Sequence, residues 1–147
     1  MERSTTVDST PTLGGQDAGA PPAMERPAPP ATAPEAVVSR RPWGGFTQYC
    51  LNQPVTVKII SVEPGCELSL QRHRHRAELW IPLDPTLRVE VDGRSWEPAV
   101  DEPVWIPAGA AHRLSAPGER GGRILEVAFG HFDEDDIERL ADRYGRA

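Results

Sequence analysis

The sequence predicts one all-β domain, a barrel or sandwich, because short runs of alternating apolar and polar residues are separated by closely spaced turn signals. At 147 residues the chain has room for a single domain. The alternation is clearest over Val55–Ile60, and turn signals follow at Pro64-Gly65, Asp92-Gly93 and Pro117-Gly118. Many short strands with nearby turns are typical of two packed sheets or a closed barrel.

The first forty residues differ in composition from the rest of the chain. Residues 1–40 contain no aromatic side chain and no isoleucine, and Ala, Pro, Thr, Ser and Gly dominate. Such a segment cannot bury enough apolar surface to offset its ordering entropy. We therefore expect a disordered Ala/Pro-rich tail over residues 1–38 and a folded domain over residues 39–147.

Seven strands are expected, each bounded by turn residues or prolines. Their ranges are Val55–Ile60, Cys66–His75, Glu78–Leu83, Leu87–Val91, Pro103–Ile106, His112–Ser115 and Arg123–Phe129. In the second of these, Leu68 and Leu70 face one side while Gln71, His73 and His75 face the other, because side chains alternate along a strand. One face of this strand therefore collects three side chains suited to metal binding or proton transfer.

The C-terminal segment predicts a short α-helix that packs on the barrel. Asp133 can cap this helix, and three acidic residues follow in the first turn, where the helix dipole favours negative charge. Ile137, Leu140 and Tyr144 would share one apolar face. Gly145 is expected to end the helix.

Charge and hydropathy exclude several classes of partner. The formal net charge of −6 argues against nucleic-acid binding, because a phosphate backbone attracts basic surfaces. No apolar run approaches the roughly 18 residues of a membrane span, and the N-terminus lacks the apolar region of a signal peptide. Cys50 and Cys66 lack the spacing of a metal or redox motif and are expected to be reduced. We therefore expect a cytoplasmic protein without a membrane or nucleic-acid partner.

Four residues in two segments are candidate ligands of one divalent metal ion. Gln71 and His73 share a strand face, Glu78 follows after a short step, and His112 comes after a strand and a tight turn. Imidazole with carboxylate and amide oxygens suits zinc, with manganese or cobalt as alternatives. A strand histidine taken alone is more often a hydrogen-bonded polar residue, so the prediction depends on the combined spacing. Three or four protein ligands would leave room for water or substrate, which is typical of a catalytic site.

Several motifs between Arg41 and Arg146 occur together. They are Arg41-Pro42-Trp43-Gly44, the block Gln71-Arg72-His73-Arg74-His75-Arg76-Ala77-Glu78, Ile106-Pro107-Ala108-Gly109 followed by His112, and Tyr144-Gly145-Arg146. This set resembles the type II mannose-6-phosphate isomerase domain. The resemblance implies a cupin barrel, that is, a double-stranded β-helix or jelly roll.

The same resemblance implies an activity and partners. The family is a metal-dependent aldose–ketose isomerase that interconverts mannose 6-phosphate and fructose 6-phosphate, which feeds GDP-mannose and polysaccharide biosynthesis. Its domain usually follows a mannose-1-phosphate guanylyltransferase. No Gly-rich nucleotide loop precedes the predicted barrel here, so we expect the isomerase half alone, with a separate guanylyltransferase as a possible partner. A homodimer is implied by resemblance only.

The resemblance also suggests roles for residues other than the metal ligands. His75 is a candidate base for the proton transfer, or a hydrogen-bonded wall residue. Lys58 matches a lysine of the family's first strand and either contacts the sugar or is solvated. The phosphate is expected to contact arginines, because the guanidinium fork matches its geometry. The candidates within the motifs are Arg76, Arg113, Arg139 and Arg146.

Three departures from the family pattern keep a second function open. Leu79 replaces a histidine, Ala116 replaces an asparagine, and Asp84-Pro85 replaces a Ser-Gly turn after a strand into which Pro82 is also inserted. Proline removes a ladder hydrogen bond, so this segment is expected at a sheet edge or a bulge. The alternative is a non-catalytic cupin that binds a sugar phosphate or nucleotide sugar as a sensor or partner subunit. An iron-dependent cupin oxygenase is less favoured, because Gln71 replaces a histidine usual at iron.

Overall fold

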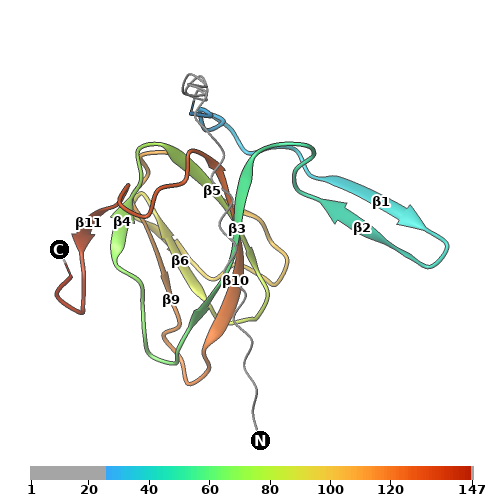
Figure 1. Cartoon of the computed structure of the whole chain (residues 1–147). Helices are drawn as coiled ribbons and strands as arrows, with labels where there is room; N and C mark the ends of the chain where they lie inside the picture. The colour runs from blue at the N-terminus through green and yellow to red at the C-terminus, as the bar shows by residue number, and fades with distance from the viewer. Residues whose placement is uncertain (1–25, 147) are drawn as a thin grey trace, which may run out of the picture.

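Two packed β-sheets form a barrel, and a β-hairpin projects from one side of it (Figure 1). The computed structural model describes residues 26–146. One sheet has the strand order β3-β10-β5-β8 and the other the order β11-β4-β9-β6-β7. The strands are β1 Val37–Arg41, β2 Gly44–Gln48, β3 Val55–Val62, β4 Leu70–Arg72, β5 Arg76–Pro82, β6 Arg88–Val91, β7 Arg94–Trp96, β8 Val104–Ile106, β9 His112–Ser115, β10 Gly122–Gly130 and β11 Glu138–Ala141.

The main core lies between the two sheets and consists of the inward side chains of alternating strands. In β10, Ile124 and Glu126 point into the barrel, whereas Leu125 and Phe129 point outward. The buried apolar residues of this core are Val62, Trp80, Leu87, Val89, Val104, Ile106, Ala110, Leu114, Ala116 and Ile124. Burying each of the larger aliphatic side chains, rather than leaving it in water, stabilises the fold by about 1.5–3 kcal/mol.

The outer face of the four-stranded sheet carries a second apolar cluster. It comprises Leu79, Ile81, Val127 and Phe129. Tyr49 and Cys50, in the segment between β2 and β3, pack against this cluster. β5 is therefore covered on both faces, which explains why all of its residues are buried.

The predicted all-β class is confirmed, and six of the seven predicted strands lie within two residues of the observed ones. The seventh, Cys66–His75, is shorter than expected. Only Leu70–Arg72 forms β4, and Glu67 makes an isolated bridge to Ser115. The sequence pattern misses β1, β2, β7 and β11, although the Asp92-Gly93 signal correctly places the turn between β6 and β7.

The predicted C-terminal helix is wrong. Residues 138–141 form strand β11, which pairs with β4, and residues 26–146 contain no helix long and apolar enough to cross a membrane. One of the three acidic residues expected in the first helical turn, Asp136, instead caps the turn between β4 and β5. The Asp136 carboxylate accepts the backbone N–H groups of Arg74 and His75, each at 2.9 Å. The hydrogen bonds to β4 and to the β4–β5 turn stabilise this segment as a strand and turn. They outweigh the local preference of its residues for a helix.

The expectation that the Pro82 segment lies at a sheet edge or bulge is also wrong, because β5 is an interior strand between β10 and β8. Pro82 is the last residue of β5. β8 pairs with β5 only from Glu78 to Trp80, so no ladder bond to β8 is needed at Pro82. The Pro82 carbonyl instead accepts the N–H of Asp101 at 2.9 Å.

The N-terminal boundary stays a prediction for the most part. Residues 1–25 of the predicted tail lie outside the described residues. Residues 26–36 form no strand or helix, but Pro29 lies against Gly130 at the end of β10. β1 begins at Val37, two residues before the expected domain boundary.

Candidate metal centre

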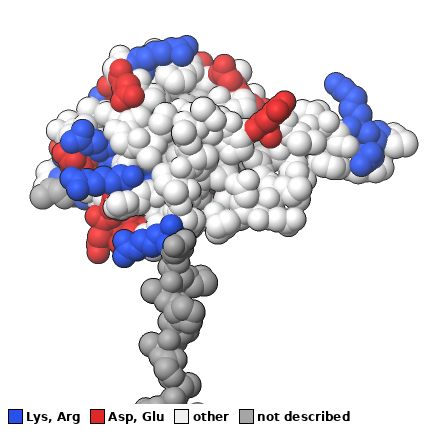
Figure 2. All heavy atoms as spheres, turned by 90° about the horizontal axis from the view of Figure 1, so that it is seen from above, with Lys and Arg blue, Asp and Glu red and all other residues white. Residues whose placement is uncertain are grey.

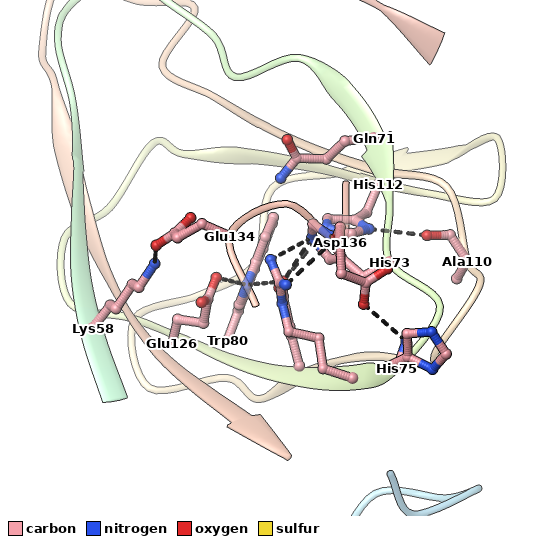
Figure 3. A network of polar contacts seen from close by, with 12 residues as sticks. Lys58, Gln71, His73, His75, Trp80, Ala110, His112, Glu126, Glu134 and Asp136 are labelled. Carbon is pink, nitrogen blue, oxygen red and sulfur yellow. Dashed lines mark hydrogen bonds and ion pairs between the residues drawn. The ribbon is translucent and has the colours of Figure 1, made fainter. Parts of the chain in front are cut away.

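Three buried side chains contributed by both sheets meet inside the barrel, and two of them, His73 and His112, are labelled in Figure 3. His73 follows β4, Glu78 lies in β5 and His112 begins β9. Their potential ligand atoms all lie within 4.8 Å of one another. The Glu78 Oε1 atom is 3.2 Å from His73 Nε2, and its Oε2 atom is 3.4 Å from His112 Nε2. The structure thus brings together three of the four predicted ligands.

Backbone carbonyls fix the orientation of both imidazoles. The Nδ1 atom of His73 lies 2.7 Å from the Asp136 carbonyl oxygen, and that of His112 lies 2.9 Å from the Ala110 carbonyl oxygen. Each Nδ1–H therefore donates to the backbone, which directs the Nε2 lone pair at Glu78. His112 Nε2 is buried, and no described residue donates a hydrogen bond to it. A lone pair facing a carboxylate oxygen is stabilised when a cation, a metal ion or a proton, lies between them.

A close backbone approach positions the carbonyl that holds His73. Gly130, at the end of β10, has φ +101°, and a Cβ atom there would lie 2.5 Å from the His75 carbonyl oxygen. The next residue, His131, donates its N–H to that same carbonyl at 3.1 Å. The loop that follows then returns past β4 and brings Asp136 to His73. Glycine at position 130 is thus needed for the geometry of the centre.

Glu78 has the electrostatics of an ionised ligand. Burial alone would raise the pKa of its carboxyl, but the facing His112 and His73 hold that pKa well below its usual value. The Trp80 indole N–H also donates to Glu78 Oε2 at 3.1 Å. Two imidazoles and a carboxylate are a donor set that zinc, manganese or cobalt accepts. The residues present therefore fit a divalent metal ion.

Arg76 lies at the cluster, but its guanidinium N–H groups already contact protein atoms instead of facing the space that a phosphate would occupy. Its Nε–H donates to Glu78 Oε1 at 3.1 Å, and its Nη2 lies 3.2 Å from His73 Nε2. Its Nη1 donates to the Asp133 carbonyl at 2.9 Å, and the guanidinium lies 4.3 Å from the Phe132 ring centroid. This buried cation thus contacts two of the atoms that a metal ion would use. Phosphate binding by Arg76 stays a prediction that these contacts do not favour.

A cavity of about 200 Å³ opens beside the cluster. It is lined by Lys58, Ile60, Leu68, Ser69, Gln71, Arg76, Glu78, Glu126, Glu134, Ile137 and Arg146. Lys58 and Arg146, two residues singled out in the sequence, therefore reach the same space as Glu78. Gln71 also lines it, but its Oε1 accepts the Ser69 hydroxyl at 2.8 Å, so its role as a fourth ligand stays a prediction.

His75 is not brought to this cavity. Its side chain is exposed and lines a separate surface depression together with Arg72 and Arg74. Its backbone N–H is held by the Asp136 carboxylate (Figure 3). The strand ends at Arg72, so the alternation that places His73 inward does not continue to His75.

Two of the predicted phosphate-binding arginines lie elsewhere. Arg113 faces outward from β9, where it pairs with Glu90 at 2.8 Å and with Glu67 at 3.5 Å. It lines a different depression, on the outside of the five-stranded sheet. Arg139 is half-buried in β11, where its backbone pairs with Gln71, and it does not line the cavity.

Glu126 is a site residue that the sequence analysis misses. It is buried, lines the cavity, and accepts the Trp80 indole N–H at 3.1 Å. Burial, and then the nearby charge of Glu78, raise the pKa of the Glu126 carboxyl to about 7. The available signal was a charged residue at an inward position of the apolar strand Arg123–Phe129.

Replacing Glu126 by Gln should change how stability depends on pH in the metal-free protein. The folded-state pKa of about 7 exceeds the ordinary value of 4.5, so the stability contributed by Glu126 is full below pH 4.5 and is lost as pH rises through 7. Glutamine stays neutral and keeps an acceptor for Trp80. The melting temperature of Glu126→Gln relative to wild type should therefore rise from pH 5 to pH 8. A difference that stays constant over that range would show that Glu126 titrates normally.

Residues 33–142 match the family model described as mannose-6-phosphate isomerase C-terminal. The chain belongs to this family. The resemblance noted in the sequence is thereby confirmed, and it covers the hairpin, the barrel and the centre.

The similar curated proteins are much longer than this chain. Alginate biosynthesis protein AlgA of Pseudomonas aeruginosa is 43% identical over 107 residues, which is 72% of this chain and 22% of AlgA. Mannose-1-phosphate guanylyltransferase of Escherichia coli K12 is 42% identical over the same shares of the two chains. Xanthan biosynthesis protein XanB of Xanthomonas campestris is 41% identical, with 23% of it covered. The chain thus spans about a fifth of the length of these relatives.

Solved structures of low sequence identity share the fold. Capsular polysaccharide assembling protein CapF of Staphylococcus aureus has a TM-score of 0.55 at 17% identity, with 74% of this chain and 35% of that chain covered. TT1209 of Thermus thermophilus has a TM-score of 0.51 at 14% identity, with 70% and 90% covered. This likeness concerns the fold alone. The predicted cupin barrel is confirmed.

Proposed function

We propose that this domain is a metal-dependent aldose–ketose isomerase that interconverts mannose 6-phosphate and fructose 6-phosphate. The main support is one observation: two oriented imidazoles face the ionised Glu78 carboxylate at a cavity that also contains the Glu126 carboxyl. Isomerisation needs a cation beside the sugar oxygens and an acid–base group within reach of the same carbons. Family membership supports the choice of a sugar phosphate.

His73, Glu78 and His112 would hold the ion, for which zinc is the first candidate. When bound, a divalent ion stabilises the negative charge that develops on the sugar oxygens as a proton moves between C2 and C1. In the metal-free protein burial raises the pKa of Glu78, but the facing histidines hold it well below its usual value, so the carboxylate is already anionic before an ion binds. Trp80 holds the carboxylate in place through its indole N–H.

Glu126 is our candidate for the proton carrier. A carboxyl whose pKa is about 7 both accepts and releases a proton near neutral pH, which suits a reversible isomerisation. A base positioned in this way contributes roughly 10²–10⁴-fold to the rate. We prefer it to His75, because His75 lines a different depression.

Lys58 and Arg146 are our candidates for holding the phosphate. Both line the cavity from the side nearer to solvent, Lys58 beside Glu134 and Arg146 beside Asp142. The Lys58 ammonium also lies 4.2 Å from the centroid of the Phe132 ring. A phosphate entering there would compete with Glu134 for Lys58, an exposed ion pair of the kind that is weak in water, and would approach the half-exposed Arg146 guanidinium beside the buried Asp142 carboxylate.

The departures from the family pattern do not face the centre. Leu79 points away from the cavity into the outer apolar cluster, and Ala116 packs in the main core. Pro82 ends β5 and does not line the cavity. The substitutions that favoured a non-catalytic sensor therefore leave the candidate site unaltered, which supports the enzyme.

The chemistry also suggests a partner and a compartment. After a mutase moves the phosphate from C6 to C1, the sugar phosphate would pass to a mannose-1-phosphate guanylyltransferase, an activity that one similar protein carries in its name. Cys50 and Cys66 are free thiols, which are typical of a reducing compartment, and we propose the cytoplasm.

A coupled assay tests the proposal. Full-length protein stripped with a chelator, then reloaded with zinc, manganese or cobalt, is given mannose 6-phosphate, and fructose 6-phosphate is detected by a coupling enzyme. Turnover should disappear on stripping and return on reloading. Saturable binding of mannose 6-phosphate without turnover under every metal condition would identify a sensor instead.

Replacing Arg146 by Gln should weaken use of the substrate, whereas the matched change Arg113→Gln should not. Arg146 lines the cavity, but Arg113 lies on the outside of the other sheet. Loss of one charge-assisted hydrogen bond to phosphate corresponds to a rise in KM of roughly tenfold or more. Steady-state kinetics of the two variants provide the measurement. Equal effects of the two substitutions would argue against a phosphate at Arg146.

A further inference from the structure

One cationic side chain of the cavity comes from the turn that follows β11. Arg146 lines the cavity, and its guanidinium donates two hydrogen bonds to the Asp142 carboxylate, from Nε at 3.1 Å and from Nη2 at 2.9 Å. The same carboxylate accepts the backbone N–H of Arg146. The hydrogen bond from Arg146 lowers the pKa of the Asp142 carboxyl to about 2, so this pair is ionised at neutral pH. One carboxylate therefore holds both the backbone and the guanidinium of Arg146.

This pair differs from the other arginine–carboxylate pairs at the surface. Figure 2 shows acidic and basic groups together over the barrel. Four other partly exposed arginines among the described residues pair with carboxylates, whose side chains are 26% to 54% exposed. Asp142 is only 4% exposed, although its partner Arg146 is 51% exposed. Arg146 is also the one arginine of these five that lines the cavity.

The turn that carries the pair is fastened to the barrel. The Tyr144 hydroxyl accepts the backbone N–H of Glu67 at 3.3 Å. Arg143 Nη1 donates to the Gly65 carbonyl oxygen at 2.7 Å. Strand β11, which precedes the turn, is paired with β4. The position of the turn is therefore set by the barrel before any ligand enters the cavity.

One edge of the Arg146 guanidinium remains available to a ligand. The Asp142 carboxylate occupies the edge formed by Nε and Nη2, and no described residue accepts a hydrogen bond from Nη1. A guanidinium has five N–H donors in one plane, so the edge formed by Nη1 and Nη2 can still donate to two oxygens of a phosphate.

We propose that Asp142 is a positioning residue that holds the Arg146 guanidinium in the orientation in which it receives the substrate phosphate. This inference rests on the proposed function, because it takes a sugar phosphate as the ligand of the cavity. An arginine that is held by a carboxylate has already lost much of its rotamer freedom, so less is lost when the phosphate binds.

Repulsion between the Asp142 carboxylate and the phosphate acts in the opposite direction. At the half-exposed Arg146, water and salt screen this repulsion, which should change the affinity by about threefold. Loss of an oriented, charge-assisted hydrogen bond corresponds to roughly tenfold or more. Positioning by Asp142 therefore outweighs repulsion.

Glu134, the carboxylate beside Lys58, is expected to have the opposite effect. It is 73% exposed and accepts one hydrogen bond from the Lys58 ammonium. An ammonium is a compact charge without a planar fork, so a carboxylate does not orient it for a second anion. A phosphate at Lys58 would simply displace Glu134. Loss of Glu134 should therefore strengthen phosphate binding, whereas loss of Asp142 should weaken it.

Calorimetric titration of the zinc-loaded, full-length protein with mannose 6-phosphate tests the proposal, with mannose as the ligand that lacks the phosphate. Asp142→Asn keeps the shape of the side chain and should raise the Kd for mannose 6-phosphate by roughly three- to tenfold, without changing any binding of mannose. Glu134→Gln should lower that Kd by about threefold. Asp84→Asn is the matched control, because Asp84 accepts two similar hydrogen bonds from Arg123 away from the cavity. Melting temperature and zinc binding show whether each variant is folded.

A double-mutant cycle shows whether Asp142 acts through Arg146. Once Arg146→Gln has removed the guanidinium, adding Asp142→Asn should cause no further loss of affinity. In the coupled assay, Asp142→Asn should raise KM and leave kcat within about twofold of wild type, because the phosphate contact is the same in the ground state and the transition state.

Failure of the positioning role and failure of the isomerase give different results. If wild type binds mannose 6-phosphate with this dependence on Asp142 but does not convert it, the isomerase is wrong and the positioning role stands. If Asp142→Asn binds mannose 6-phosphate as wild type does, or causes the same loss in the Arg146→Gln background, the positioning role is wrong whether or not turnover occurs. Wild type that does not bind mannose 6-phosphate would overturn both.

Discussion

Replacing His112 by Ala is expected to lower the affinity for a divalent cation by more than about 100-fold. Residues that only hydrogen-bond to metal ligands already change metal affinity by roughly 10–100-fold. His112 would itself be a ligand, since its Nε2 atom faces the Glu78 carboxylate at 3.4 Å, so its loss should cost more. Calorimetric titration of chelator-stripped protein with zinc provides the measurement, and wild type should bind one ion per chain.

His131→Ala is the matched control, because His131 is not part of the cluster. It should bind zinc as wild type does. If His112→Ala also bound zinc with unaltered affinity and stoichiometry, the ion would be held elsewhere on the chain.

Replacing Arg76 by Met is expected to destabilise the metal-free protein by about 3–5 kcal/mol, because it leaves the buried Glu78 carboxylate without its guanidinium partner. Added zinc should then recover most of that loss, since the ion supplies positive charge at the same carboxylate. The increase in melting temperature on adding zinc should be larger for Arg76→Met than for wild type. Chemical unfolding with and without zinc measures both effects.

Arg113→Met is the control for the loss of an arginine ion pair. Its partner Glu90 lies on the outer face, and such pairs contribute about 0–1 kcal/mol. If the metal-free Arg76→Met variant had the same free energy of unfolding as wild type, Glu78 would not be an ionised carboxylate balanced by Arg76.

Strand positions were predictable because period-two alternation and turn residues are local signals. The motif spacing, and not the alternation, grouped His73, Glu78 and His112, and the structure brings these three side chains together. Alternation along the strand failed for His75, because β4 ends at Arg72 and the chain turns between His73 and the next strand. Alternation holds only as long as the strand does.

The other differences come from contacts between distant segments. The residues 133–144 carry every local signal of a helix, yet Asp136 caps the turn between β4 and β5, and β11 pairs with β4. The role of Arg76 depends on the Asp133 carbonyl, 57 residues away, and on His73. Glu126 lies in an apolar strand, and only the barrel brings it to the cavity with Glu78. None of these contacts has a signal within a short window of sequence.

X-ray absorption at the zinc edge of the reloaded protein tests most directly whether His73, Glu78 and His112 hold the ion. The account predicts a first shell of nitrogen and oxygen only, at about 2.0–2.2 Å, with the outer-shell scattering of two imidazole rings. In His73→Ala the imidazole scattering should fall to that of one ring. A sulfur shell at about 2.3 Å, which would indicate Cys50 or Cys66, or a spectrum without imidazole scattering, would contradict the proposed centre.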